Sequence, residues 1–264
     1  MRREVLWARG IYQIFSQDRV LQDLDLHFYA GERVWLCGPL GSGKGVLARL
    51  LTGNLQSDGG EIRIDGNPVG IFPAFHAQRL GIRYVGMDSR LVQSLTLGEN
   101  LCLPRLPAAC AGRYSQKTRF FAEDMCRQFE ITLDLDRPVR SLTLFEVLQA
   151  ECLRALRQRA RLIVFDRVFS PLSIEEQAGF LRLLERLKEY GICSLIVTAG
   201  TIPAFSADPC LFYNKSIKKN LNSRGNGNQR SFQFLGIYGK EGRNGHYIGN
   251  EPHQQNLSWR KGTG

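Results

Sequence analysis

The stretch GPLGSGKG, from Gly38 to Gly45, decides how the rest of this chain is interpreted. It matches the phosphate-binding pattern G-x-x-x-x-G-K through the lysine, Lys44. The pattern continues with Ser or Thr, whose hydroxyl holds Mg²⁺, but the residue here is Gly45, which has no side chain. The stretch therefore predicts a phosphate-binding loop that lacks one metal ligand.

The residues on either side of the loop support this interpretation. RVWLCG (33–38) is typical of a β-strand, and GVLARLLTG (45–53) has the apolar spacing of a helix. Backbone N–H groups of a glycine-rich loop and a helix N-terminus both favour a bound anion. The candidate nucleotide-binding residues are Gly38, Pro39, Leu40, Gly41, Ser42, Gly43, Lys44, Gly45 and Val46, with Lys44 expected to reach the β- and γ-phosphates. A chance glycine-rich turn is the less favoured alternative.

The remaining body alternates between predicted strands and helices. Short strands are expected at 61–67, 82–87, 161–166 and 193–198, and helices at 117–130 and 173–190. RLIVFD (161–166) is a continuous apolar run, as in a strand buried on both faces, and CSLIVT (193–198) is a further buried strand. This order predicts an α/β fold with a mostly parallel sheet flanked by helices.

Composition excludes several classes of protein. The 264 residues are 43% hydrophobic, enough for a real core, but no apolar run approaches the roughly 20 residues of a membrane-spanning helix. The N-terminal MRREVLWARG has no apolar signal region. The seven cysteines form no C-x-x-C pair, which argues against zinc and a disulfide framework and fits a reducing cytosol.

The net charge of +10 is concentrated near the C-terminus. Residues 211–264 carry 9 Lys/Arg and 2 Asp/Glu, or +7, which leaves +3 for residues 1–210. Because the same segment holds 9 Gly and 8 Asn without amphipathic periodicity, we predict a basic, disordered tail at 214–264. No motif supports nucleic-acid binding, so no nucleic-acid partner is expected.

Asp166 ends the buried run RLIVFD and is the candidate metal ligand. A phosphate-binding loop usually works with an acid that holds Mg²⁺ at the end of another buried strand. The alternative, in which Asp166 caps a loop or a nearby helix, is less favoured once Lys44 is present.

The order of these motifs resembles the ATP-binding cassette (ABC) ATPases of the sugar-importer branch. The likeness covers about residues 4–213 and includes SLTLGENL (94–101), LDLDRPVRSLT (133–143) and the glycine loop. It implies a P-loop NTPase core with an N-terminal antiparallel β part and an inserted helical subdomain at about 88–155, within a nucleotide-binding domain at 1–213. The resemblance also places Phe15 where the family stacks an aromatic ring on adenine, with a core phenylalanine as the alternative.

Several positions depart from the pattern of that family. Met87 replaces the Gln of the Q-loop, Arg167 the Glu that polarises water, and Ala199 the switch His. Leu142–Glu146 (LTLFE) replaces the signature LSGGQ, so Leu144 and Phe145 are expected to fill space left by glycines, and Glu146 to repel phosphate. The resemblance thus implies no catalytic residue of the chain's own, whereas the D-loop Ser170–Ser173 is retained.

The resemblance implies an ATP-binding subunit of a carbohydrate importer, with ATP, weakened Mg²⁺ coordination and weak or absent hydrolysis. The implied partners are ABC permease subunits and a second ABC ATPase domain, in a heteromeric pair on the cytoplasmic face of the plasma membrane. Open alternatives are a non-hydrolysing regulatory or scaffold subunit, the truncated half of a tandem ABC ATPase, and a decaying reading frame whose tail is a frameshift product. The transported solute is not encoded in these motifs.

Overall fold

The computed structural model describes residues 3–15, 18–69, 73–88, 91–103, 116–198, 210–212 and 236–237. Its strands are β1 (Glu4–Phe15), β2 (Asp18–Tyr29), β3 (Arg33–Cys37), β4 (Gly59–Ile64), β5 (Asn67–Val69), β6 (Ile82–Val85), β7 (Leu162–Asp166), β8 (Cys193–Val197), β9 (Cys210–Phe212) and β10 (Gly236–Ile237). Its helices are α1 (Lys44–Leu51), α2 (Ala74–Arg79), α3 (Leu97–Cys102), α4 (Gln116–Gln128), α5 (Leu144–Arg157) and α6 (Ile174–Glu189), with a 3-10 turn at Val139–Ser141.

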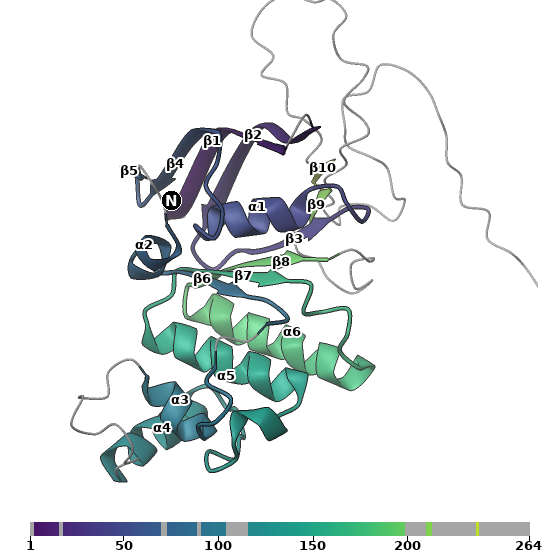
Figure 1. The fold of residues 1–264 in the computed structure, drawn as a ribbon. Coiled ribbons are helices and arrows are strands. Elements are labelled where there is room, and N and C mark those ends of the chain that lie inside the picture. Colours follow the sequence, from purple (N-terminus) through teal and green to yellow (C-terminus); the bar gives the residue numbers. More distant parts are fainter. Residues whose placement is uncertain are drawn as a thin grey trace, which may run out of the picture.

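An antiparallel sheet in the order β2-β1-β4-β5 forms one layer of the molecule. The long strands β1 and β2 make a hairpin, and β4 pairs with the other edge of β1. Helix α1 lies between this sheet and the second sheet (Figure 1). Leu47, Leu50 and Leu51 of α1 are buried there, which joins the two sheets through one apolar core.

The second sheet has the order β10-β9-β3-β8-β7-β6, and all neighbours are parallel except the pair β10 and β9. Side chains of β7 alternate between its faces. Leu162 and Val164 pack on the side of α1, whereas Ile163 and Phe165 pack on the side of α5 and α6. Both faces are covered, which explains why RLIVFD is apolar without interruption.

Helices α3, α4 and α5 follow β6 in the chain and gather at the far end of the molecule from the antiparallel sheet (Figure 1). The aromatic rings of Phe165 on β7 and Phe180 on α6 meet edge to face, with their centroids 5.1 Å apart. This contact anchors α6 against the sheet. The limits of the predicted helical subdomain, about 88–155, stay a prediction.

The predicted fold class is confirmed, including the N-terminal antiparallel part. The expected strand and helix segments agree with β3, β4, β6, β7, β8, α1, α4 and α6 to within a few residues. Of the predicted tail 214–264, Gly236–Ile237 forms β10 beside β9, and the other residues lie outside the described part of the chain. Disorder of the tail therefore stays a prediction.

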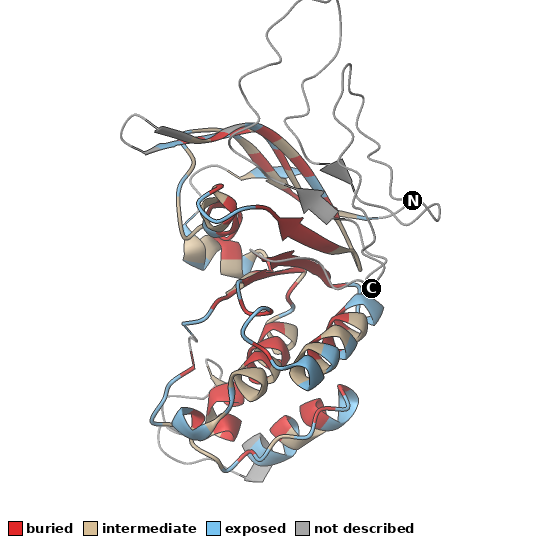
Figure 2. Ribbon diagram, turned by 90° about the vertical axis from the view of Figure 1, so that its right-hand side faces the viewer, coloured by how far each residue is buried: buried red, intermediate tan, exposed pale blue. Residues whose placement is uncertain are grey.

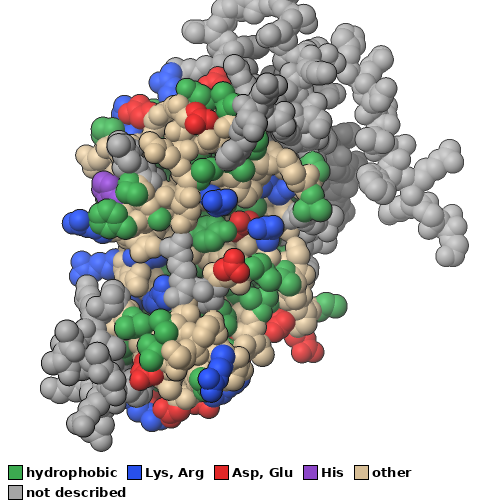
Figure 3. Space-filling model, in the orientation of Figure 1, with side chains coloured by type: hydrophobic (Ala, Val, Ile, Leu, Met, Phe, Trp, Pro, Cys, Tyr) green, Lys and Arg blue, Asp and Glu red, His purple; other side chains and the backbone are tan. Residues whose placement is uncertain are grey.

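Burial follows these layers. Buried residues line the sheet and the inward sides of the helices (Figure 2). Positive and negative side chains are interspersed over the face shown in Figure 3. Within the described residues, no helix is both long and apolar enough to cross a bilayer.

Candidate nucleotide-binding site

The glycine loop connects the carboxyl end of β3 to the first residue of α1. Gly43 directly precedes the helix and has φ 105°, a conformation that residues with a side chain rarely adopt. A Cβ atom at this position would lie 2.8 Å from Cγ1 of Val20 on β2. Glycine is therefore required here for two reasons, the backbone angle and the close approach of β2.

The N-terminus of α1 is open to an anion. Gly43 provides no side-chain cap, and the first turn of the helix contains no acidic residue. The first N–H groups of a helix have no partner within the helix, and they carry a partial positive charge. The loop thus presents donors and a favourable field at the carboxyl edge of the parallel sheet, where ligands of α/β proteins usually bind.

Lys44 is buried and lies inside the loop. Its ammonium donates to the carbonyl oxygens of Gly38 and Pro39, both at 2.7 Å, and to Oγ of Ser42 at 3.1 Å. Burial lowers the pKa of this ammonium, while the nearby Cys37 and Asp166 partly offset that effect. The structure therefore places a cation, wrapped by loop oxygens, next to the end of β7.

Asp166 ends β7, and its carboxylate is almost completely buried. The hydroxyl of Tyr84 on β6 donates to Oδ2 of Asp166 at 2.8 Å. Burial and this hydrogen bond raise the pKa of Tyr84 to about 12, so the hydroxyl keeps its proton and remains a donor. Tyr84 was not among the predicted site residues. Its position on the strand next to β7 was the signal that could have identified it.

Arg167 follows Asp166 and adopts a left-handed backbone with φ 60°. Its N–H donates to the carbonyl oxygen of Val197 at 2.9 Å, and its Nε lies 3.6 Å from Oδ1 of Asp166. The Arg167 side chain is 68% exposed, so this ion pair contributes at most about 1 kcal/mol. A permanent cation thus occupies the position after the strand's carboxylate and cannot accept a proton from water.

Gly45 faces the same carboxylate. A Cβ atom at Gly45 would lie 3.7 Å from Oδ2 of Asp166. A serine side chain at this position would therefore begin beside Asp166. The arrangement supports the prediction that positions 45 and 166 belong to one site.

The residues present do not fit a magnesium site. Mg²⁺ requires oxygen ligands in nearly octahedral geometry. Gly45 supplies no hydroxyl, Oδ2 of Asp166 already accepts from Tyr84, and Oδ1 has no hydrogen bond but faces Arg167. Met87, two residues beyond β6, is exposed and carries a thioether, a poor ligand for Mg²⁺. No group of three or more His, Cys, Asp or Glu in the described residues could hold a metal ion.

Phe15 ends β1 at the tip of the β1–β2 hairpin. Its backbone pairs with Asp18, and Val20 on the returning strand touches Gly43 of the loop. The hairpin tip therefore lies near the phosphate loop, as the prediction for Phe15 requires. The side chain of Phe15 is outside the described part of the structure, so stacking on adenine stays a prediction. Ala199 also lies outside the described residues.

The N-terminus of α5 is closed by its own chain. The Oγ atom of Thr143 accepts from the N–H of Glu146 at 3.2 Å, and Oε2 of Glu146 accepts from the N–H of Thr143 at 2.7 Å. The other carboxylate oxygen pairs with Nη1 of Arg137 at 2.7 Å. This capping box gives Thr143 and Glu146 a structural role, which was not predicted although the S/T-x-x-E pattern in the sequence indicates it.

Leu144 and Phe145, which are expected to fill the space left by the signature glycines, lie in the first turn of α5. Both side chains are partly buried against the core that contains α5 and α6. A Cβ atom on Gly179 of α6 would lie 2.6 Å from Cζ of Phe145, so this ring packs closely over that glycine. The structure shows that Phe145 packs on α6. That Leu144 and Phe145 keep out the phosphate of a nucleotide bound to a partner domain stays a proposal.

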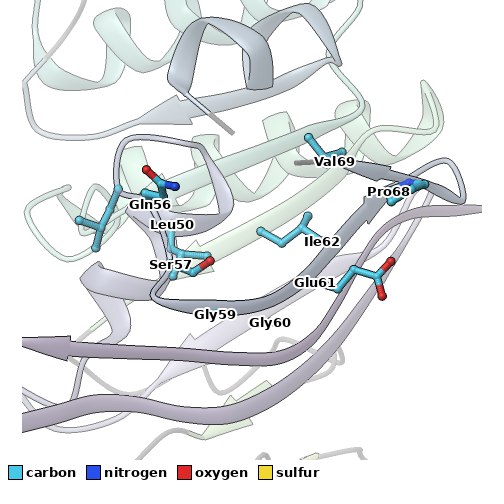
Figure 4. A pocket seen from close by; sticks show the side chains of 10 residues that line it. Leu50, Gln56, Ser57, Gly59, Gly60, Glu61, Ile62, Pro68 and Val69 are labelled. Carbon is cyan, nitrogen blue, oxygen red and sulfur yellow. The ribbon is translucent and has the colours of Figure 1, made fainter. Parts of the chain in front are cut away.

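A separate hollow of about 380 Å³ lies near the C-terminal end of α1 (Figure 4). It is lined by Leu50, Leu55, Gln56, Ser57, Gly59, Gly60, Glu61, Ile62, Pro68 and Val69. Its one carboxylate, Glu61, pairs with Arg63 at 2.7 Å. This hollow is at the opposite end of α1 from Lys44 and contains none of the predicted site residues.

The comparison with known families agrees with the geometry. The family model described as "ABC transporter" matches residues 21–170, more than half of the chain. This chain belongs to the ABC transporter family. ABC ATPases bind ATP with Mg²⁺, pair with permeases and dimerise.

Curated relatives of this ABC domain are longer proteins. The ribose import ATP-binding protein RbsA 1 of Rubrobacter xylanophilus is 34% identical over 190 residues, 72% of this chain and 38% of the relative. The arabinose import ATP-binding protein AraG of Pectobacterium atrosepticum is 29% identical over 189 residues, 72% of this chain and 37% of the relative. The chain thus spans less than two fifths of the length of these relatives.

Solved structures show the same fold. A nucleotide-free ATP-binding cassette from an ABC transporter superposes with a TM-score of 0.67 at 19% identity, covering 80% of this chain and 88% of that one. A dimeric ATP-binding cassette, MJ0796, bound to ADP and phosphate, superposes with a TM-score of 0.65 at 19% identity and covers 80% and 94%. At this level of identity the likeness concerns the fold of the ABC domain alone.

Proposed function

We propose that this chain is an ATP-binding subunit of an ABC importer for a carbohydrate and that its own hydrolysis is weak or absent. One observation carries the proposal. Buried Lys44 lies in the glycine loop at the uncapped N-terminus of α1, which supports phosphate binding there, while the position after Asp166 holds the cation Arg167. Transfer of a phosphoryl group depends on positioned charges and water, and Arg167 cannot polarise water as a carboxylate does.

The relatives support carbohydrate as the class of cargo, because ribose and arabinose import ATP-binding proteins are similar to this chain over about 72% of its length. The ATPase domain works on the cytoplasmic face of the membrane against permease subunits. The particular sugar is set by those partners, not by this domain.

A heteromeric pairing follows from α5. In a dimer of ABC domains each nucleotide lies between the loop of one domain and the signature helix of the other. The N-terminus of α5 is capped by Glu146, so a second copy of this chain offers a poor surface for phosphate. We propose that a different ABC domain completes the site built on Lys44.

A second candidate function is half of a tandem ATPase, or a regulatory subunit that does not hydrolyse ATP. Arg167 after Asp166 and the capped N-terminus of α5 favour this candidate, because neither offers a group that ATP hydrolysis needs. A half that needs another domain for turnover would bind nucleotide alone and hydrolyse it only in a mixed complex.

The proposal is tested by measuring binding of a fluorescent ATP analogue to the purified chain, beside the Lys44→Ala variant. Saturable binding that Lys44→Ala removes is the expected result. Absence of binding by the wild-type protein, or binding that persists unchanged in Lys44→Ala, would exclude a nucleotide site on this loop.

A further inference from the structure

We propose that this site takes ATP as the metal-free polyanion, because Tyr84 and Arg167 hold Asp166 in place of Mg²⁺. The inference rests on the proposed nucleotide binding and specifies the form of the nucleotide. Tyr84 and Arg167 both lie against the Asp166 carboxylate in the described part of the structure.

The carboxylate of Asp166 is buried and already faces two side chains. Asp166 is only 2% exposed in its side chain, and its two oxygens face different partners. Oδ2 accepts the Tyr84 hydroxyl at 2.8 Å, and Oδ1 faces Nε of Arg167 at 3.6 Å. A metal ion that bound Asp166 would have to replace the hydrogen bond on one oxygen or approach the guanidinium on the other.

Position 45 lacks a metal ligand. A serine or threonine at position 45 would bring its hydroxyl beside Asp166, since a Cβ atom there lies 3.7 Å from Oδ2. Gly45 removes that oxygen, and the sulfur of Met87 does not replace an amide oxygen toward a hard cation. Of the three side chains at positions 45, 87 and 166, only that of Asp166 therefore has an oxygen atom that could bind a metal ion.

The balance of charge around Asp166 is positive. Lys44 and Arg167 are both positive and both interact with Asp166, so two positive charges and one negative charge leave a net charge of +1 before any metal binds. A dication is repelled by such a site, whereas the free triphosphate, which carries more negative charge than its magnesium complex, is attracted. The exposed guanidinium of Arg167 supplies one of the positive charges that Mg²⁺ would otherwise bring.

The test compares ATP affinity in excess Mg²⁺ with ATP affinity in excess chelator. For the wild-type chain we expect the dissociation constants for ATP in the two conditions to agree within about threefold. A loss of about tenfold or more on removal of Mg²⁺ would overturn the inference and leave the proposed function intact. No binding in either condition would overturn the proposed function and this inference with it.

Paired substitutions test the two side chains. The double variant Tyr84→Phe/Arg167→Gln removes both side chains that face the Asp166 oxygens. We therefore expect Mg²⁺ to strengthen ATP binding by this variant. We also expect Mn²⁺ to bind to it in the presence of ATP, as measured by electron paramagnetic resonance. The matched control is Tyr190→Phe/Arg182→Gln, at the C-cap of α6 and on α6, which replaces two exposed side chains of the same types. A double variant with the same lack of metal dependence as the wild type would show that Tyr84 and Arg167 do not keep the metal out.

Discussion

Helices α1 and α5 begin in opposite ways. Helix α1 follows Gly43, which has no side chain, and its first turn contains no acidic residue. Helix α5 follows Thr143, and the carboxylate of Glu146 accepts a hydrogen bond from the Thr143 N–H at the start of the helix. Both helices have the same backbone donors and the same dipole, so the difference lies in side chains alone.

The comparison shows how an anion site is made or lost at a helix N-terminus. A capping box satisfies the end donors with a carboxylate of the same chain, and that charge also excludes a second anion. Helices α3 and α6 are closed in the same way, by Thr96 with Glu99 and by Ser173 with Glu176. Among α1, α3, α5 and α6, only α1 is left without such a cap, and it is the helix that carries Lys44.

The largest expected effect comes from removing the cation at the open helix. Lys44→Ala should weaken ATP binding by at least about a hundredfold, or about 2.7 kcal/mol, because several hydrogen bonds to a charged group are lost. Lys188→Ala, on the half-exposed end of α6, is the control and should bind ATP like the wild type. If the two variants bound fluorescent ATP with equal affinity in titrations, the open N-terminus of α1 with Lys44 would not be the nucleotide site.

A second prediction concerns the glycine that opens α1. Gly43→Ala should lower the free energy of unfolding by about 2 kcal/mol, because a strained left-handed backbone and a contact with Val20 add together. Gly66→Ala, where φ is 79° and nothing lies within 4 Å of the added Cβ, isolates the backbone strain and should cost about 1 kcal/mol. Urea unfolding measures both. Equal losses would mean that Val20 yields and that the close approach is unimportant.

The third prediction separates binding from chemistry at the open helix. Gly45→Ser should make ATP binding tighten roughly fivefold on addition of Mg²⁺, about 1 kcal/mol, because the hydroxyl returns a ligand beside Asp166. The gain stays small because Tyr84 and Arg167 still hold the Asp166 carboxylate. Phosphate release should stay near background, since Arg167 remains. Robust hydrolysis by Gly45→Ser alone would show that Gly45, and not the wider loss, silences the site. Gly66→Ser, in the turn between β4 and β5 and outside the loop, is the control.

The smallest effect is expected at the closed helix. Thr143→Ala should lower the free energy of unfolding by about 1 kcal/mol through loss of the N-cap, while ATP affinity stays unchanged. Thr132→Ala, at an exposed loop position, should change neither quantity. Tighter nucleotide binding by Thr143→Ala would reveal that α5 also takes an anion once its cap is removed.

Most of the fold could be predicted because the spacing of apolar residues and the positions of turn residues in the sequence match the buried faces and the ends of the strands and helices. RLIVFD indicates a doubly covered strand by its apolar run, CSLIVT indicates a buried strand although it contains Ser194, and Ser173 with Glu176 marks the start of α6. The short helix α3 was not predicted as a separate element, although Thr96 and Glu99 form the same capping box. Its six residues are too few to establish a helical period.

The site was predictable where one local pattern carries the chemistry, as in Gly38–Lys44. Asp166 was found because it ends an apolar strand. Tyr84 was missed because its role depends on which strands are neighbours in the sheet, and β6 lies beside β7 although 76 residues separate Val85 from Leu162. Glu146 was interpreted as a repulsive charge, but Arg137 and the capping box engage its carboxylate.

The central claim, that this ABC domain binds ATP at α1 without hydrolysing it, is tested most directly by phosphate release from the wild-type chain under conditions in which it is saturated with ATP. Lys44→Ala at the same protein concentration is the reference. The account predicts release far below about 1 s⁻¹ per site, at a rate that Lys44→Ala does not lower. Turnover of about 1 s⁻¹ or faster that Lys44→Ala abolishes would contradict it.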